Sequence, residues 1–151
     1  MSNRVVLDTG PLGMLTHPRA SKAAAEWFLS MLQTDCEVII PEIADYEVRR
    51  NMILEKMTES IERLDLLKKT ENVNYLPIDT PTMLLAASLW AEARQRHKPT
   101  ADKHALDGDV ILAAQAKRAG AVVATDNVGH LDQFVQTRKW RDMGFSGDKI
   151  T

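Results

Sequence analysis

Four acidic residues have the chemistry and the positions needed for metal-assisted hydrolysis. Asp8 directly follows the apolar run at residues 5–7, and Asp126 lies just beyond a later apolar run. Glu47 falls about one turn into a predicted helix, and Asp109 opens another. Carboxylate oxygens are the ligands that Mg²⁺ and Mn²⁺ prefer. If the four carboxylates meet in one crevice, they would hold one or two such ions, which could activate a water for displacement at phosphorus.

The elements that must position these acids follow from the hydrophobic pattern. Short apolar runs lie at residues 5–7, 38–40, 75–78 and 121–124. Helical spacing of apolar residues predicts helices at 21–33, twice within 41–69, at 80–97 and at 110–119. The predicted helix boundaries are an N-cap at Thr58, an N-cap at Thr80 and a stop at Gly120. Strands that alternate with helices predict a three-layer α/β/α domain with a mainly parallel sheet.

The limits of this domain are also predicted. We expect it to span residues 1–143 and the small or polar residues 144–151 to form a loose tail. Pro77 cannot donate to a strand ladder, so the third apolar run should be short or lie at a sheet edge.

In an open parallel sheet, ligands bind in the crevice outside the carboxyl ends of the strands. The four acids come from four separate segments, and all are predicted at this edge. Two carboxylates about 4 Å apart repel by roughly 4 kcal/mol at an effective dielectric near 20. A marginally stable domain does not easily carry several such pairs. A divalent cation removes the repulsion, so the set of acids predicts a metal site.

Each acid also has a structural interpretation. Asp8 fits a turn residue or a helix N-cap, and Asp107 fits an N-cap of the helix that follows it. Asp109 would favour the positive end of that helix dipole. Glu47 fits a surface acid beside Arg50. Taken one at a time, each acid is better explained by structure, so the functional prediction depends on the whole set.

Composition narrows the class of protein. The chain has 151 residues, of which 44% are hydrophobic and 26% charged, with a formal net charge of −2. This balance is typical of a globular domain and unlike a strongly basic nucleic-acid coat protein. No apolar run reaches the roughly 20 residues that span a bilayer. The single cysteine, Cys36, and the lack of an export signal at the N-terminus predict a cytoplasmic protein without disulfides.

Other enzyme classes lack their required partners. Asp-Thr-Gly at residues 8–10 also marks aspartic proteases, which need an all-β framework and a second such loop. A phosphatase of the haloacid dehalogenase type needs a second Asp where this chain has Gly10. A receiver domain would need paired acids and a late Lys, and neither is evident. No phosphate loop of the G-x-x-x-x-G-K-[ST] type is present, and the four histidines and Cys36 show no zinc-ligand spacing.

Four segments together resemble the PIN-domain ribonucleases, most closely the VapC-like toxins of bacterial toxin–antitoxin pairs. They are VVLDT at residues 5–9, IPEIADYEVRR at 40–50, DVILAAQA at 109–116 and VVATDN at 122–127. Many relatives have a further acid just beyond the fourth, where this chain has Asn127. The resemblance covers nearly the whole chain and implies a PIN-like sheet of about five strands.

The hypothesis is therefore a Mg²⁺- or Mn²⁺-dependent endoribonuclease, for which the resemblance implies 5′-phosphate and 3′-hydroxyl products. The metal ligands and catalytic residues would be Asp8, Glu47, Asp109 and Asp126. Residues expected to orient these carboxylates or metal-bound water are Thr9, Thr125 and Asn127. Candidates for contact with RNA phosphates are Arg49 and Arg50.

The implied partners are RNA, with structured RNA such as tRNA as the family expectation, an antitoxin protein and a second copy in a homodimer. The antitoxin would lay a helix or strand in a groove near residues 27–28 and 52–57, and the alternative is that these residues belong to the hydrophobic core. The alternative is a non-catalytic PIN-like module that binds RNA or protein and whose acids are purely structural. Metal-dependent RNA cleavage separates the two hypotheses.

Overall fold

The computed structural model describes residues 3–96 and 103–143 and contains a sheet of five strands, paired in parallel throughout. The strands are β1 (Arg4–Leu7), β2 (Glu37–Pro41), β3 (Val73–Leu76), β4 (Val122–Thr125) and β5 (Thr137–Lys139). Their order across the sheet is β3-β2-β1-β4-β5. The predicted tail, residues 144–151, lies outside the described residues.

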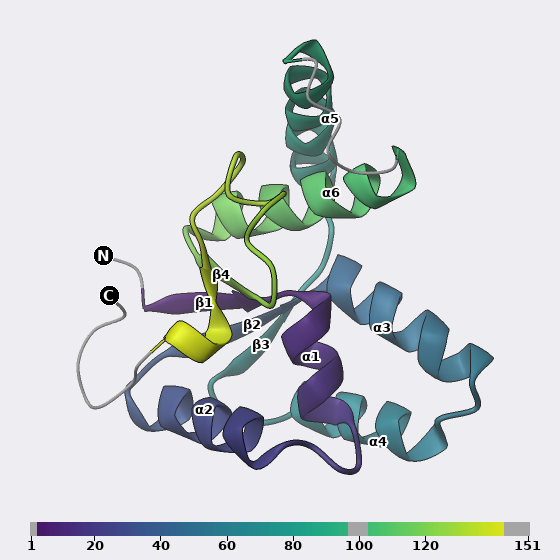
Figure 1. Ribbon diagram of the computed structural model, residues 1–151, viewed down its shortest axis with the longest axis vertical. Coiled ribbons are helices and arrows are strands. Elements are labelled where there is room, and N and C mark those ends of the chain that lie inside the picture. Colours follow the sequence, from purple (N-terminus) through teal and green to yellow (C-terminus); the bar gives the residue numbers. More distant parts are fainter. Residues whose placement is uncertain (1–2, 97–102, 144–151) are drawn as a thin grey trace.

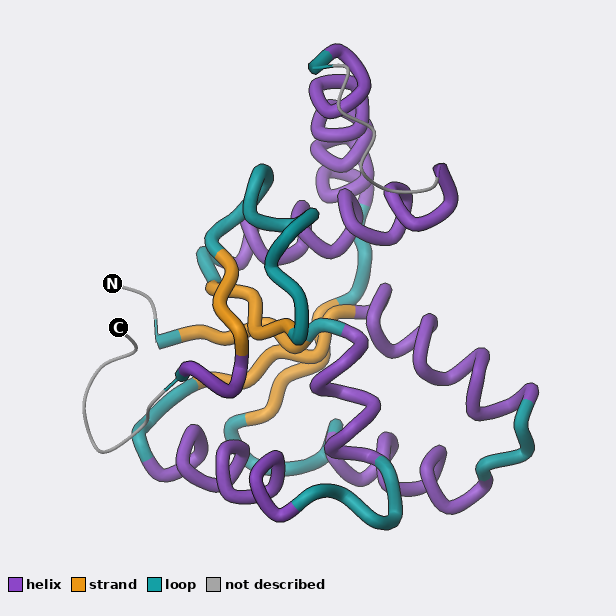
Figure 2. The backbone as a smooth tube through the Cα atoms, viewed as in Figure 1, coloured by secondary structure: helices purple, strands orange, loops and turns teal. Residues whose placement is uncertain are grey.

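Six α-helices surround this sheet (Figures 1 and 2). They are α1 (Thr9–Thr16), α2 (Lys22–Gln33), α3 (Glu42–Leu54), α4 (Thr58–Leu67), α5 (Thr80–Gln95) and α6 (Lys103–Ala119). A short 3₁₀-helix, η1 (Trp140–Asp142), follows β5. The predicted three-layer α/β/α architecture is confirmed.

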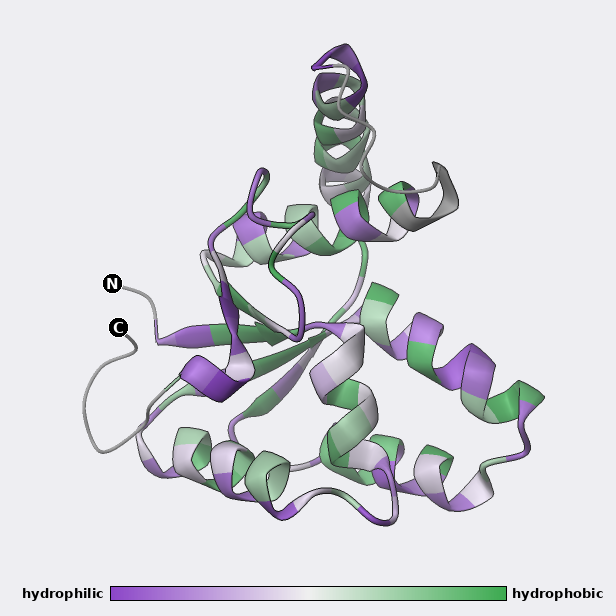
Figure 3. Cartoon of the chain, viewed as in Figure 1, coloured by the Kyte–Doolittle hydropathy of each residue, from purple (hydrophilic) through white to green (hydrophobic). Residues whose placement is uncertain are grey.

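The central strands are buried on both faces. Val5 and Leu7 of β1 point into a core shared with α1 to α4, while Val6 points to the opposite face and packs with Leu112 of α6. All three β1 residues are fully buried. This explains why their run is continuously apolar rather than alternating. In the hydropathy view β1 and β2 are largely hydrophobic and β5 is hydrophilic (Figure 3).

The second face of the sheet is covered by α6, and α5 packs on α6 rather than on the sheet (Figure 1). Leu106, Val110 and Ala113 of α6 join Ala86 and Leu89 of α5 in a separate buried cluster. Among the described helices, none is long and apolar enough to cross a membrane.

Several helix boundaries differ from prediction. The N-cap of α2 is Ser21, and the predicted end at Gln33 is confirmed. Thr58 is the first residue of α4 and Met57 its cap, without a side-chain bond. For α5 the cap is Asp79, whose carboxylate accepts from the Thr82 N–H. A carboxylate supplies a stronger cap acceptor than the neighbouring Thr80 hydroxyl, because its charge also favours the helix dipole.

Three elements, α1, β5 and η1, were not predicted, and α6 is longer than predicted. The α1 helix begins directly after Asp8, and the short β5 contains no hydrophobic residue. As expected, β3 is an edge strand and ends at Leu76, before Pro77. Gly120 follows α6 with φ 64°, a left-handed conformation that suits a glycine at a helix end.

Candidate functional site

The site lies at the point where the chain changes direction across the sheet. From β1 the chain moves through β2 to β3, and it then returns to the other side of β1 to form β4. Connections on either side of such a switch point leave a crevice at the carboxyl ends of the two strands. Register pairs Leu7 with Ala124. Asp8 and Asp126 therefore leave neighbouring strands at the same edge.

Asp8 both caps α1 and faces the crevice. Its Oδ1 accepts the Thr9 backbone N–H at 2.7 Å, and its Oδ2 accepts the Thr125 hydroxyl at 2.7 Å. Burial raises the pKa of Asp8, the two hydrogen bonds oppose this rise, and the negative charge of Asp126 adds to it. The N-cap interpretation is thus correct, but it does not exclude a functional role, because the same carboxylate lies against another acid.

Glu47 reaches the crevice from α3. The Thr9 hydroxyl donates to Oε1 of Glu47 at 2.9 Å, so this carboxylate is tied to the beginning of α1. Its other oxygen, Oε2, lies 3.9 Å from the Arg50 guanidinium. A Cβ atom at Gly108 would lie 2.7 Å from that oxygen, which shows how closely α6 approaches the Glu47 side chain.

Asp109 comes from α6 and is partly buried. The prediction that it opens the helix is wrong, because α6 begins at Lys103. Burial and the negative charge of Asp8 raise the pKa of Asp109 to about 6, with a smaller contribution from Glu47 and an opposing one from His130. The carboxylates of α6, β1 and α3 therefore share one electrostatic environment. Asp107 is exposed inside the same helix, so its predicted N-cap role is also wrong.

Asp126 follows β4, and its side chain is contacted by two residues of η1. The Trp140 indole N–H donates to Oδ1 of Asp126 at 2.7 Å, and Arg141 lies 3.6 Å from the same oxygen. Oδ2 points at Gly10, where a Cβ atom would collide with it. Asp126 therefore approaches the first turn of α1 so closely that only a glycine fits there.

The threonines and the asparagine predicted to support the acids divide into two groups. The Thr9 and Thr125 hydroxyls each donate to a site carboxylate. Asn127 is exposed, and its side chain instead accepts the Gly129 backbone N–H, as in a turn. The Asn127 side chain therefore makes a local turn contact, and its backbone N–H donates to the Thr125 hydroxyl at 3.2 Å.

The donor set suits a hard cation. All four acidic side chains offer oxygen ligands, and burial together with the charges of neighbouring acids raises the pKa of Asp8 and Asp109. In the described part of the chain, no three acidic, histidine or cysteine side chains are already gathered closely enough to hold one ion. Mg²⁺ commonly binds through one or two carboxylates and keeps several waters. Asp8 and Asp126, which follow neighbouring strands at the same edge of the sheet, are suited to that mode of binding.

The two candidate arginines differ. Arg49 makes two hydrogen bonds to Asp45, at 2.9 and 3.1 Å, and one of 2.7 Å to Asp65. Because these bonds to α3 and α4 occupy most of its guanidinium donors, Arg49 has few left to bind a phosphate. Arg50 is half-exposed, lies beside Glu47 and covers the Tyr46 ring at 5.1 Å. Arg50 is thus the better placed of the two for RNA.

Sequence reasoning missed the glycines and the tryptophan that shape this crevice. Gly10 and Gly108 each lie one or two residues from a predicted acid, and each leaves room for an acid of another element. That proximity is the signal that could have found them. Trp140 carried no such signal, because it follows a polar strand that the hydrophobic pattern did not reveal.

Known structures share this fold. FitAcB from Neisseria gonorrhoeae is 21% identical, with a TM-score of 0.70, and the match covers 92% of this chain and 99% of that one. VapBC2 from Rickettsia felis, bound to a DNA fragment from its promoter, is 14% identical with a TM-score of 0.74, covering 91% and 98%. VapBC-1 from nontypeable Haemophilus influenzae is 23% identical with a TM-score of 0.67, covering 91% and 98%. At these identities the likeness establishes the fold.

No protein with a curated description matches the sequence. The model of the PIN domain, however, matches residues 5–133. This stretch includes all four acids of the crevice and every strand except β5. Because the match spans well over half of the chain, the protein belongs to the PIN domain family.

Proposed function

We propose that the protein is a Mg²⁺- or Mn²⁺-dependent endoribonuclease. The metal would be held by Asp8 and Asp126, with Glu47 and Asp109 binding directly or through water. The observation that carries this proposal is that Asp8, Glu47, Asp109 and Asp126 come from four segments to one edge of the sheet. Burial first, and the charges of neighbouring acids second, raise the pKa of Asp8 and Asp109. A bound cation would supply the charge that neutralises this crevice and polarises the scissile phosphate.

The side chains of the chain itself have distinct roles in this proposal. A carboxylate that accepts the proton of the attacking water works best when its pKa approaches the operating pH. Glu47 and Asp109 are the candidates for that role; in the metal-free protein, burial and the charge of Asp8 raise the pKa of Asp109 to about 6. The Thr125 and Thr9 hydroxyls fix the orientation of Asp8 and Glu47. Removing those hydroxyls would loosen the crevice without changing its charge.

The test is cleavage of labelled RNA by purified protein titrated with Mn²⁺, then repeated with chelator. Asp8→Asn and Asp126→Asn keep the side-chain size and remove the charge, so each should abolish most of the cleavage. The control is Asp107→Asn, on an exposed face of α6. If both site variants cleave as well as the parent protein, the metal-site assignment is wrong. Cleavage that persists in chelator would favour a metal-independent activity.

We further propose that the protein is the toxin of a toxin–antitoxin pair and acts in the cytoplasm. The solved neighbours include VapBC and FitAB assemblies. Trp27 and Met52 of the expected antitoxin groove lie in the hydrophobic core. An apolar hollow of about 350 Å³ is instead lined by residues that include Phe28 and Leu29 of α2 and Leu66 of α4. Leu29 and Leu66 are 55% and 64% exposed, so a partner helix would bury them.

The toxin role predicts growth arrest on expression and rescue by co-expression of a small protein encoded beside it. Leu29→Glu should abolish rescue while leaving growth arrest intact, because the acidic crevice is unchanged. Growth arrest that Asp8→Asn does not relieve would separate toxicity from nuclease activity.

A homodimer is the remaining proposed assembly. Large apolar side chains are exposed on α3 and α5, including Ile53, Leu54, Leu84 and Trp90. Light scattering after size-exclusion chromatography tests the oligomeric state, with Leu54→Glu and Leu84→Glu as the disrupting variants. The alternative function, a non-catalytic module, predicts RNA or partner binding that neither Mn²⁺ nor the Asp8→Asn substitution alters.

A further inference from the structure

Trp140 connects the hydrophobic core to one acid of the crevice. It is the first residue of η1 and only 3% exposed, yet its indole N–H donates to Oδ1 of Asp126 at 2.7 Å. We propose that Trp140 is a positioning residue that orients Asp126 for metal binding, an inference that rests on the proposed function. An indole N–H is a donor only and cannot itself bind a cation.

Strand register brings the two residues together. β4 and β5 pair in parallel with Thr125 opposite Lys139. The residue after each strand, Asp126 and Trp140, therefore leaves the sheet at the same level. A three-residue strand with no hydrophobic side chain contributes little to the core. Its role in this fold is to place the indole N–H of Trp140 at the carboxyl end of β4.

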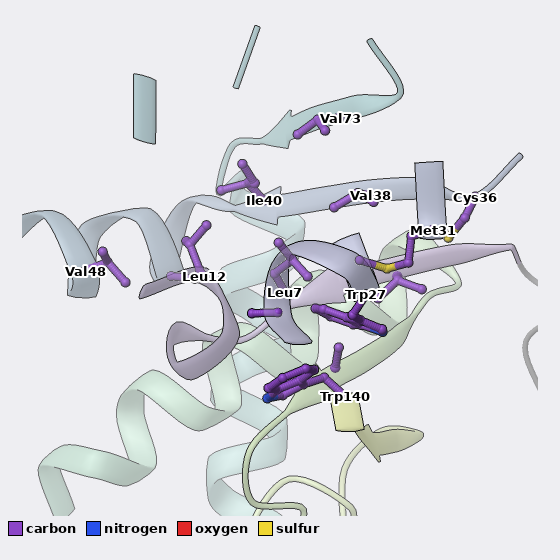
Figure 4. Packing of buried hydrophobic residues seen from close by; sticks show 14 of the residues in the cluster. Leu7, Leu12, Trp27, Met31, Cys36, Val38, Ile40, Val48, Val73 and Trp140 are labelled. Carbon is purple, nitrogen blue, oxygen red and sulfur yellow. The ribbon is translucent and has the colours of Figure 1, made fainter. Parts of the chain in front are cut away.

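The core fixes the direction of the indole. The Trp140 ring packs against Trp27 of α2, with ring centroids 5.2 Å apart and planes tilted by 45° (Figure 4). Both tryptophans belong to the cluster that contains Val5 and Leu7 of β1. A donor whose ring is buried and packed against a second aromatic ring is restricted in its rotamers. The Asp126 carboxylate thus receives its hydrogen bond from a rigid group.

Asp126 needs such support. Its side chain is 43% exposed, and burial alone would not restrict its rotamers. With Oδ1 bound to Trp140 and near Arg141, the other oxygen, Oδ2, is the one aimed at Gly10 and the crevice. Groups that hydrogen-bond a ligating carboxylate commonly change metal affinity by roughly 10–100-fold. The indole therefore leaves one oxygen free and fixes where it points.

The test measures Mn²⁺ affinity of the full chain from the electron paramagnetic resonance signal of free Mn²⁺. Trp140→Phe keeps an apolar ring but removes the donor, so affinity should fall by roughly tenfold. The matched control, Trp27→Phe, removes the other indole of the pair and should change affinity less than twofold. In an Asp126→Asn background, Trp140→Phe should cause no further loss. Thermal melting checks that each variant is folded.

A second measurement needs no substitution in the core. The three tryptophans give three indole N–H signals in a ¹⁵N correlation spectrum. Asp126→Asn removes a charged acceptor and should shift the Trp140 signal, while the Trp90 signal on α5 stays in place. Addition of Mg²⁺ to the parent protein should also move the Trp140 signal.

The outcomes separate the inference from the proposed function. Parent protein that binds Mn²⁺ while Trp140→Phe binds it equally well overturns the positioning role and leaves the nuclease proposal standing. An equal loss in Trp27→Phe, or a further loss in the Asp126→Asn background, assigns Trp140 to general stability and also overturns it. If the Trp140 indole signal does not shift in Asp126→Asn, the hydrogen bond on which the positioning role depends is absent. Parent protein that binds no Mn²⁺ overturns both proposals.

Discussion

Thr9, the first residue of α1, donates a hydrogen bond of 2.9 Å from its hydroxyl to Oε1 of Glu47 on α3. The same residue donates its backbone N–H to Asp8. One threonine thereby contacts two acids of the crevice that come from different elements. The spacing between β1 and α3 at the crevice depends on this contact.

Thr9→Val should remove the hydroxyl while preserving side-chain shape. A hydrogen bond to a charged group contributes about 1.5–3 kcal/mol, so unfolding free energy should fall by roughly 1–2 kcal/mol, and Mn²⁺ affinity should also fall. Urea denaturation and Mn²⁺ titration measure the two effects. Thr9→Ser retains the donor and is the control. Equal behaviour of the valine and serine variants would contradict a role for the hydroxyl.

Gly10→Ala should damage the site through a steric effect. The new Cβ would collide with Oδ2 of Asp126, so the carboxylate must rotate away from the crevice. We expect a loss of RNA cleavage of at least tenfold. Gly13→Ala, on the same helix, meets nothing within 4 Å and should stabilise α1 by about 0.5–1 kcal/mol with activity unchanged. Comparable activity in the two variants would contradict the close approach of Asp126 to α1.

Asp109 should make the metal-free protein less stable as pH rises. Burial, Asp8 and Glu47 raise its folded pKa to about 6 from an ordinary 3.8, against the opposing effect of His130. The folded state therefore binds the proton more tightly than the unfolded state between these pH values. Stability from this group is fully present below about pH 4 and is lost as pH rises through 6.

Asp109→Asn removes that loss. In chelator at pH 8 the free energy of unfolding of this variant should exceed that of the parent protein by roughly 1–2 kcal/mol. The difference is smaller than the full pKa shift implies, because part of the carboxyl group faces water. The difference should shrink toward pH 4.5, and urea denaturation at several pH values measures it. Mn²⁺ should stabilise the parent protein more than the variant. A constant difference across this pH range would show that titration of Asp109 is not the cause.

Arg49→Met should mainly lower stability, whereas Arg50→Met should mainly weaken RNA binding. Asp45 is 6% exposed, and burial alone would raise its pKa, but Arg49 and Lys68 together hold that pKa below its usual value. Loss of Arg49 leaves Lys68 as the remaining cation and should cost roughly 2–4 kcal/mol of unfolding free energy. Loss of the exposed Arg50 should cost less than about 0.5 kcal/mol.

RNA binding provides the second half of this comparison. Arg50→Met should weaken RNA binding and lower the slope of affinity against salt, as expected for one lost phosphate contact. Arg49→Met, measured at a temperature where it is folded, should keep that slope. Filter binding across a range of salt concentrations measures both variants. A changed slope for Arg49→Met alone would reverse the assignment.

The sequence was most informative where strand ends carry polar residues. Apolar runs buried on both faces end abruptly, so the positions of Asp8 and Asp126 relative to β1 and β4 were predictable. Asp109 was placed too near the beginning of α6 because residues 103–107 are mostly polar. The buried Leu106, at helical spacing from Val110, is the signal that extends this helix toward its true beginning.

Other features could not be predicted from local pattern. β5 has the sequence Thr-Arg-Lys at a sheet edge, so its pairing depends on backbone contacts with β4 rather than on hydrophobicity. The hydrogen bond from Trp140 to Asp126 depends on that pairing. The collisions that require glycine at residues 10 and 108 involve acids from distant elements. Proximity to Asp8 and Asp109 marks these two glycines in the sequence, but which acid each one accommodates is set by three-dimensional packing.

The central position of β1 in the sheet has a consequence for the order in which the chain folds. β1 pairs with β2, about thirty residues later, but also with β4, where Val5 lies opposite Val122. Contacts so distant along a chain form slowly, because a long loop must close first. Asp8 and Asp126 become neighbours only after this closure. A chain still emerging from the ribosome therefore carries Asp8 and Glu47 well before it has an assembled crevice, and under the proposed function it would not yet cleave RNA.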